Sequence, residues 1–150
     1  MRFAKKVIIP VDFTDQLPAL LKPLHEMAFL EHSEIHFVHV FPTITYPVFF
    51  GDFPMVYPIT ADLKVMEESG HSFLVNMTEK VLPNNFKGKV IHRILSSDEP
   101  KRKLSNYAKE EKADLIIIPT RSKHGIFDSS FAQYVNKHTH CNVLLIKHES

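Results

Sequence analysis

The sequence predicts a single doubly wound α/β domain with a parallel sheet and helices on both faces. Short β-branched runs alternate along the chain with longer segments whose apolar residues recur at helical spacing. The first run, VIIPV, is apolar at consecutive positions, which is typical of a strand buried on both faces. The length of 150 residues, with 44% hydrophobic and 23% charged residues, suits one globular domain over residues 1–150.

Five strands are expected, at residues 6–11, 34–41, 89–95, 114–118 and 142–147. Four helices are expected between them, from Thr14 to about residue 28 and over residues 60–82, 99–112 and 128–138. Thr14 should cap the first helix, and Pro23 inside it should remove a hydrogen bond or bend it. Asp98 should cap the third helix. That helix is expected to bury Leu104, Tyr107 and Ala108.

The charge balance and the single cysteine exclude several classes of protein. Eighteen Lys and Arg residues against 17 Asp and Glu residues give a formal net charge of +1, whereas a nucleic-acid binder needs a basic stripe. The basic run Lys101, Arg102 and Lys103 is best explained as a solvated helix face. Cys141 stands alone, which excludes an internal disulfide framework and fits a reducing compartment. We expect a cytoplasmic protein with no signal peptide and no membrane span.

Ligands of a doubly wound sheet bind beyond the carboxyl ends of its strands, where the strand order reverses. The segments expected at that edge are residues 12–14, 41–59 and 119–128. Candidate binding residues should therefore come from these three segments.

Several stretches of the chain resemble the universal stress protein family. VIIPVDFTD is similar to the family's first strand, which ends in a proline, one or two residues and an aspartate, and VHVF to its second strand. SSDEPKRKLSNYAKEEKADLIIIPTRS resembles its capped helix, following strand and glycine-rich turn, and NKHTHCNVLLIK its last helix end and strand. The resemblance covers nearly the whole chain and is weakest over residues 42–95. It implies a five-stranded parallel sheet in the order 3-2-1-4-5 and homodimers through residues 142–147.

Many members of this family bind ATP through the motif G-x-x-G-x9-G-(S/T), which follows the fourth strand. Glycines let backbone N–H groups approach the phosphates, and the next helix adds the dipole of its N-terminus. In this chain the first two glycine positions hold Pro119 and Ser122, and proline has no N–H to offer.

The last glycine of the motif is also missing. Counting forward places it at residues 132–133, which are Ala and Gln, whereas alignment backward from Cys141 places it at Ser129 and Ser130 with a deletion of about three residues. Gly125 is the one glycine in the region. The part of the site that binds the polyphosphate is therefore expected to be impaired. ATP and AMP are both candidate ligands, but tight ATP binding is not expected.

The residues that match the nucleoside-binding half of the family's site are present in this chain. Asp12 matches a carboxylate near ribose and adenine, and Val40 matches a position whose backbone contacts adenine. The competing interpretation of Asp12 is a helix cap or turn carboxylate. Cationic and hydroxyl groups near the missing glycine motif come from Thr120, Arg121, Lys123 and His124. The nucleotide-binding candidates are Asp12, Phe13, Val40, Pro119, Thr120, Arg121, Ser122, Gly125, Ser129 and Ser130.

The histidines are not expected to bind a metal. His36 and His39 lie three residues apart on one strand, so the period of two places them on opposite faces, each half-buried with a hydrogen-bond partner. His138, His140 and Cys141 form H-x-H-C, a spacing that matches no compact zinc motif. Cys141 is expected to be a small core residue rather than a nucleophile.

The segment from Pro42 to Pro58, PTITYPVFFGDFPMVYP, is expected to be a long loop at the binding edge. Its aromatic residues are Tyr46, Phe49, Phe50, Phe53 and Tyr57. Three roles stay open for them: a satellite cluster folded over the sheet edge or the next helix, a lid over the pocket, or a docking patch for a protein partner.

The leading functional hypothesis is a non-catalytic cytoplasmic stress-response or regulatory protein with weak, altered or absent adenine-nucleotide binding. The alternatives are a protein-docking module acting through residues 42–58 and an ATP-binding or hydrolysing protein. Asp128, Ser129 and Ser130 suggest a hydrolase at first sight, but no G-x-S-x-G elbow is present and helix capping explains them. No catalytic residue and no metal is assigned.

Overall fold

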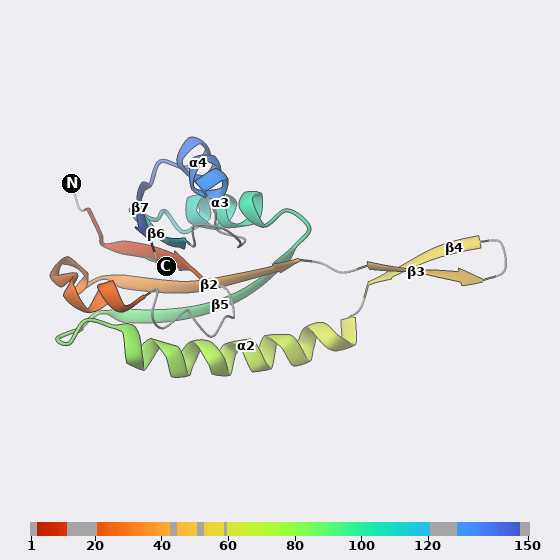
Figure 1. Ribbon diagram of the computed structural model, residues 1–150, viewed down its shortest axis with the longest axis horizontal. Helices are drawn as coiled ribbons and strands as arrows, with labels where there is room; N and C mark the ends of the chain where they lie inside the picture. The colour runs from red at the N-terminus through yellow and green to blue at the C-terminus, as the bar shows by residue number, and fades with distance from the viewer. Residues whose placement is uncertain are drawn as a thin grey trace.

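The computed structural model describes residues 3–11, 21–42, 45–50, 53–58, 60–120 and 129–147. Its main sheet has five parallel strands in the order β5-β2-β1-β6-β7. They are β1 (Lys6–Pro10), β2 (Glu34–Pro42), β5 (Lys89–Ser97), β6 (Leu115–Thr120) and β7 (Asn142–Lys147). The predicted doubly wound sheet in the order 3-2-1-4-5 is confirmed, with helices on both faces (Figure 1).

The central strand β1 and its neighbour β6 are buried along almost their whole length. Val7, Ile8 and Ile9 of β1 are fully buried, and every residue of β6 is buried. The edge strands β5 and β7 instead mix exposed and half-buried residues. The continuous apolar runs therefore correctly predicted the strands that are covered on both faces.

In the described residues three α-helices cover the sheet, with α2 (Thr60–Val81) on one face and α3 (Pro100–Glu110) and α4 (Ser129–His138) on the other (Figure 1). Their bounds agree with the predicted ranges to within two residues. None of the described helices is long and apolar enough to cross a membrane.

The start of α3 differs from the prediction in one respect. Asp98 does not cap the helix, because the N-cap residue is Glu99 and no side chain caps it. The Glu99 N–H instead donates to the hydroxyl of Ser97 at 3.0 Å, and Pro100 opens the helix at a position that needs no N–H donor. The predicted inward face is confirmed, because Leu104, Tyr107 and Ala108 are all buried.

The α-helix predicted after the first strand is wrong over its described part. Residues 21–30 form two short 3-10 helices, η1 (Lys22–Glu26) and η2 (Ala28–Leu30). Pro23 lies in the first turn of η1, where its ring removes no helical hydrogen bond, and Met27 leaves the helical region with φ −89° and ψ 79°. Leu21, Leu24 and Leu30 are still fully buried, so the apolar stripe packs on the sheet as expected. Thr14 lies outside the described residues.

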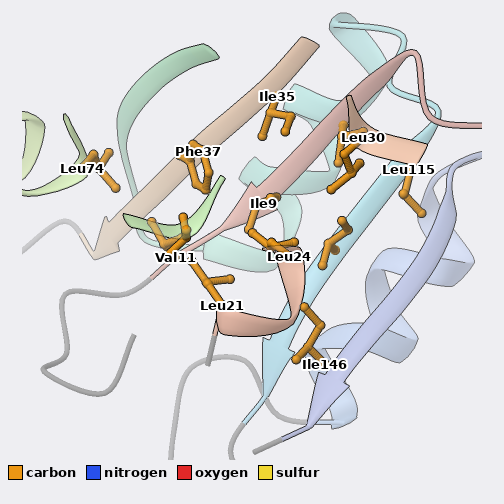
Figure 2. Packing of buried hydrophobic residues seen from close by; sticks show 13 residues of the cluster. Ile9, Val11, Leu21, Leu24, Leu30, Ile35, Phe37, Leu74, Leu115 and Ile146 are labelled. Carbon is orange, nitrogen blue, oxygen red and sulfur yellow. The ribbon is translucent and has the colours of Figure 1, made fainter. Parts of the chain in front are cut away.

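Two apolar clusters hold these layers together, one on each face of the sheet. Figure 2 shows the first cluster, in which β1, β2 and β6 pack against residues of η1, η2 and α2. The second cluster joins the opposite face of the same strands to α3 and α4 through Leu104, Tyr107, Phe131 and Val135. The alternation of side chains along each strand divides its residues between the two clusters.

His36 and His39 lie on opposite faces of β2, as predicted, and both are buried rather than half-buried. Nδ1 of His36 lies 2.7 Å from the Tyr107 hydroxyl, and its Nε2 lies 3.0 Å from the Glu34 carboxylate. The hydrogen bond from His36 holds the pKa of Glu34 below its usual value, and Lys6, with its Nζ 3.4 Å away, adds to this effect. This polar network closes the amino end of the sheet against α3.

The segment predicted as a long loop over residues 42–58 contains a β-hairpin. Strands β3 (Thr45–Phe50) and β4 (Phe53–Pro58) pair antiparallel in a sheet that, within the described residues, has no third strand. Figure 1 shows this hairpin projecting past the carboxyl end of β2, away from the sheet and from α2. The prediction of a loop is wrong because the aromatic and β-branched residues between the prolines favour extended, paired backbone.

A cavity of about 560 Å³ between α2 and β5 contains a partly buried histidine, His92. Thr78 donates its hydroxyl hydrogen to the Leu74 carbonyl, so it accepts from Nε2 of His92 at 2.7 Å. Burial lowers the pKa of His92 from its usual value, and the neighbouring His71 lowers it further. The neutral ring is thus the form that fits between α2 and the sheet.

A lowered pKa means that the unfolded chain takes up a proton at higher pH than the folded chain does. Stability from His92 is therefore present above about pH 6.5 and is lost as the pH falls below that value. We expect His92→Gln, which cannot be protonated, to lose less stability than the wild type between about pH 7.5 and 5.5. The urea midpoint of unfolding at the two pH values measures this loss of stability. His71→Gln is the comparison variant, and it should reduce the loss by less than His92→Gln does. Parallel losses in wild type and His92→Gln would contradict the assignment.

Candidate functional site

The candidate site lies at the carboxyl ends of β1 and β6, the two strands between which the sheet order reverses. In the described residues β1 pairs with β6 at Val7↔Leu115 and Ile8↔Ile116, whereas β6 pairs with β7 as far as Thr120↔Lys147. Pro10 and Pro119 have no amide hydrogen with which to extend the β1–β6 ladder. The two strands therefore stop pairing before β6 ends, at the edge where a doubly wound sheet binds its ligands; we call this place the β1–β6 edge.

The long strands β2 and β5 extend past the end of β1 at this edge. Residue 38 of β2 pairs with Pro10 at the end of β1, but the pairing of β2 with β5 continues to Pro42↔Ser97. Val40 lies in this extension, and it is only 4% exposed within the cluster under α3 and α4. The side chain of Val40 therefore belongs to the core.

His39 holds the end of β1 against β2. Its Nδ1 donates to the carbonyl of Val11 at 2.7 Å, and the N–H of Val11 donates to the Val38 carbonyl at 2.9 Å. Both backbone groups of Val11 are therefore tied to β2 at the residue immediately before Asp12 in the sequence. The sequence indicated that His39 had a partner, but it did not identify this positioning role because the two residues are 28 positions apart.

The predicted nucleotide-binding residues fall into three groups. Pro119 and Thr120 are buried at the carboxyl end of β6, and Thr120 is 8% exposed. Ser129 is the first residue of α4, and Ser130 follows it with an exposed side chain. The candidates that lie outside the described residues are Asp12, Phe13, Arg121, Ser122 and Gly125, together with Lys123 and His124. The structure thus brings the end of β6 and the start of α4 to the same edge of the sheet.

Lys101, which the sequence predicted to lie on a solvated face, instead contacts the start of α4. It lies in the first turn of α3, and its Nζ donates to the hydroxyl of Ser130 at 3.1 Å. A cavity of about 420 Å³ beside this contact is lined by Glu99, Pro100, Lys101, Arg102 and Tyr134. The ammonium group of Lys101 adds positive charge to the first turn of α4, where the helix dipole already favours an anion.

The rest of the basic run agrees with the prediction. Arg102 and Lys103 are exposed, and Arg102 pairs with Glu99 on the same helix at 3.4 Å. Only the packing of α3 against α4 distinguishes Lys101 from Lys103, because both residues lie in the same short run of sequence.

The H-x-H-C segment is structural in the described part of the chain. Nδ1 of His138 donates to the Tyr134 carbonyl at 2.8 Å, and its ring stacks on Tyr134. Cys141 is buried among core residues and donates to the carbonyl of Ala113 at 3.1 Å. Burial raises the pKa of the Cys141 thiol, which opposes formation of the reactive thiolate. The prediction that Cys141 is a core residue is confirmed.

The aromatic candidates Tyr46, Phe49, Phe50, Phe53 and Tyr57 lie on β3 and β4. Because the hairpin projects beyond β2, these strands do not lie across the carboxyl ends of β1 and β6 (Figure 1).

Comparison with known proteins points to one family. A model of the universal stress protein family matches residues 4–147. A universal stress protein of Methanocaldococcus jannaschii is 27% identical over 149 residues, which cover 95% of this chain and 82% of that protein.

Two solved structures of the same family have a similar fold. The Arabidopsis thaliana protein with AMP bound aligns with a TM-score of 0.61 and 17% identity, over 97% of this chain and 93% of that one. The Archaeoglobus fulgidus protein in complex with dAMP aligns with a TM-score of 0.60 and 22% identity, over 98% and 100%. These likenesses show that the fold is shared.

The bond between His39 and Val11 leads to a test of stability. In His39→Leu the buried carbonyl of Val11 loses its donor, which should lower the free energy of unfolding by about 1–3 kcal/mol. His32→Leu is the control, because His32 is exposed and its replacement should change that free energy by less than about 0.5 kcal/mol. Chemical denaturation measures both variants. An equally small change in the two would show that His39 does not support the end of β1.

Proposed function

Because the chain belongs to the universal stress protein family, we propose that it is a non-catalytic, cytoplasmic regulatory protein with a weakened and altered adenine-nucleotide site. The observation that carries the proposal is Pro119, which is buried within β6 where the family's phosphate-binding motif begins with glycine. A proline at this position offers no N–H to a phosphate and fixes φ, so a tight glycine cradle cannot form there.

A side-chain cation supports an altered site rather than a lost one. Lys101 reaches Ser130 in the first turn of α4, and under one alignment Ser130 occupies the Ser/Thr position of the family's motif. A single flexible ammonium group can bind one phosphate as a point charge. It cannot replace the several backbone N–H donors that hold a triphosphate. The charge at this position therefore favours a mononucleotide over ATP.

The ligands of the related structures agree with this preference. AMP is bound to the Arabidopsis thaliana protein and dAMP to the Archaeoglobus fulgidus protein. Both ligands combine an adenine base with one phosphate. We therefore propose an adenine mononucleotide as the ligand bound at the β1–β6 edge, with Asp12 and the backbone of Val40 at the nucleoside.

We also propose that the chain forms a homodimer through residues 142–147, as the family resemblance implies. Strand β7 is an edge strand, and its Leu145 is exposed over 38% of its surface. A shallow cavity of about 290 Å³ beside it is lined by Ala132, Gln133, Asn136, Val143 and Leu145. An unpaired edge with apolar side chains suits association with a second copy.

The nucleotide proposal is tested by calorimetric titration with AMP, ATP and adenosine. We expect AMP to bind with a Kd weaker than about 10 μM and ATP to bind no more tightly than AMP. Lys101→Met should weaken AMP binding about three- to tenfold and leave adenosine binding unchanged, because only AMP carries a phosphate.

Lys103→Met is the matched control, since it removes the same charge from the exposed part of the same run. Sub-micromolar, magnesium-dependent ATP binding would show that a phosphate cradle survives. An equal loss of adenosine binding in Lys101→Met would remove the phosphate contact from the proposal.

A further inference from the structure

The cavity between α2 and β5 brings two histidines together on the side of the sheet that is remote from β6. It is lined by Glu68, His71 and Ser72 of α2 and by His92, Arg93 and Ile94 of β5. The rings of His71 and His92 meet edge to face, with their centres 5.7 Å apart and their planes at 84°. His71 is exposed on α2, and His92 is half-buried on the edge strand. The pair therefore joins a helix to the sheet at a place that is open to solvent.

Thr78 determines which nitrogen of His92 carries the hydrogen. The Thr78 hydroxyl donates to the carbonyl of Leu74, so its oxygen accepts the hydrogen on Nε2 of His92 at 2.7 Å. A neutral imidazole has one such hydrogen, so Nδ1 of His92 has a free lone pair. Among the described residues this Nδ1 has no hydrogen-bond partner, and it is not a buried atom left without one. The lone pair is therefore accessible from the cavity.

A histidine held in this way is suited to binding a metal ion. In metal sites the ring nitrogen that does not bind the ion donates its hydrogen to a neighbouring acceptor, which fixes the tautomer and the orientation of the ring. Thr78 is that acceptor for His92, and the His92 ring also stacks on Phe37 with their centres 6.1 Å apart. Burial lowers the pKa of His92, and the nearby His71 lowers it further. The ring is therefore neutral at neutral pH, which is the form that coordinates a metal.

The distance between the two rings fits a single shared ion. With a zinc–nitrogen bond of about 2.1 Å, two imidazoles bound at a tetrahedral angle have ring centres roughly 5.3 Å apart. The rings of His71 and His92 lie 5.7 Å apart, which is close to that value. Glu68, one helical turn before His71, adds a negative charge to the same cavity. The positive charge of Arg93 acts on the Tyr107 hydroxyl, which belongs to the cluster under α3 on the other face of the sheet.

We propose that His71 and His92 together bind one divalent transition-metal ion, which links α2 to β5. No group of three His, Cys, Asp or Glu residues in the described part of the chain is placed to hold a metal, so the two imidazoles are the protein ligands and water completes the coordination. Imidazole suits Zn²⁺, Cu²⁺ and Ni²⁺, whereas Mg²⁺ and Ca²⁺ prefer oxygen ligands. With two protein ligands, we expect a Kd on the order of 10 μM and an ion that exchanges readily.

This proposal departs from the expectation that the histidines bind no metal. Sequence spacing does not reveal the pair, because only the packing of α2 against β5 brings the two rings together. The proposal is independent of the nucleotide site, since β2 separates β5 from β1 in the sheet.

Calorimetric titration of the chelator-treated protein with zinc chloride tests the proposal. The tightest site of the wild type should bind one Zn²⁺ with a Kd on the order of 10 μM. His71→Gln and His92→Gln should each raise that Kd at least about tenfold, because one imidazole alone remains to bind the ion. His32→Gln is the matched control, since it removes an exposed histidine outside the cavity and should leave the Kd unchanged. Magnesium chloride should produce no binding.

Urea unfolding distinguishes lost coordination from a damaged fold. Zn²⁺ should raise the midpoint of the wild type and of His32→Gln, because it binds the folded chain, and it should not raise the midpoint of His71→Gln or His92→Gln. His71→Gln replaces an exposed side chain, so it should keep the wild-type midpoint without metal even where His92→Gln unfolds more easily. Zinc binding that survives in His71→Gln, or that His32→Gln weakens equally, would overturn the proposal. A wild type that binds no Zn²⁺ up to about 1 mM would also overturn it, because the two rings would then only pack together.

Discussion

The early end of the hydrogen-bond ladder between β1 and β6 is the constraint on which the functional part of this molecule depends. β1 is buried on both faces and paired on both sides, so it sets the position of every other strand. Pro10 and Pro119 then remove amide donors from neighbouring strands at the point where the sheet order reverses. The pairing of β1 with β6 stops there because hydrogen bonding cannot continue, while both apolar clusters keep the strands in place.

The missing N–H groups of these prolines also affect which ligand the proposed site can bind. A residue without an N–H helps to separate two strands, but it also removes a donor that a phosphate would use. The packing of α3 against α4 supplies a different donor, because it brings the ammonium group of Lys101 to Ser130. His39 meanwhile holds Val11, and with it the approach to Asp12, against β2. In the proposed site, backbone hydrogen bonds would support the nucleoside side and one side-chain cation the phosphate side.

The sequence by itself determined the five strands of the main sheet, the α-helices after the first, and the opposite faces of His36 and His39. These follow from periodicity, which is local and depends on neighbouring residues. The sheet order followed from the family resemblance. It also indicated the missing phosphate donor, because proline lacks an N–H in any fold. Only the tertiary structure decided that residues 21–30 form 3-10 helices, that Lys101 differs from Lys103, and that His39 bonds Val11. Each of these depends on distance between segments or on the pairing register, and a contact between distant residues has no signature in the spacing of either one.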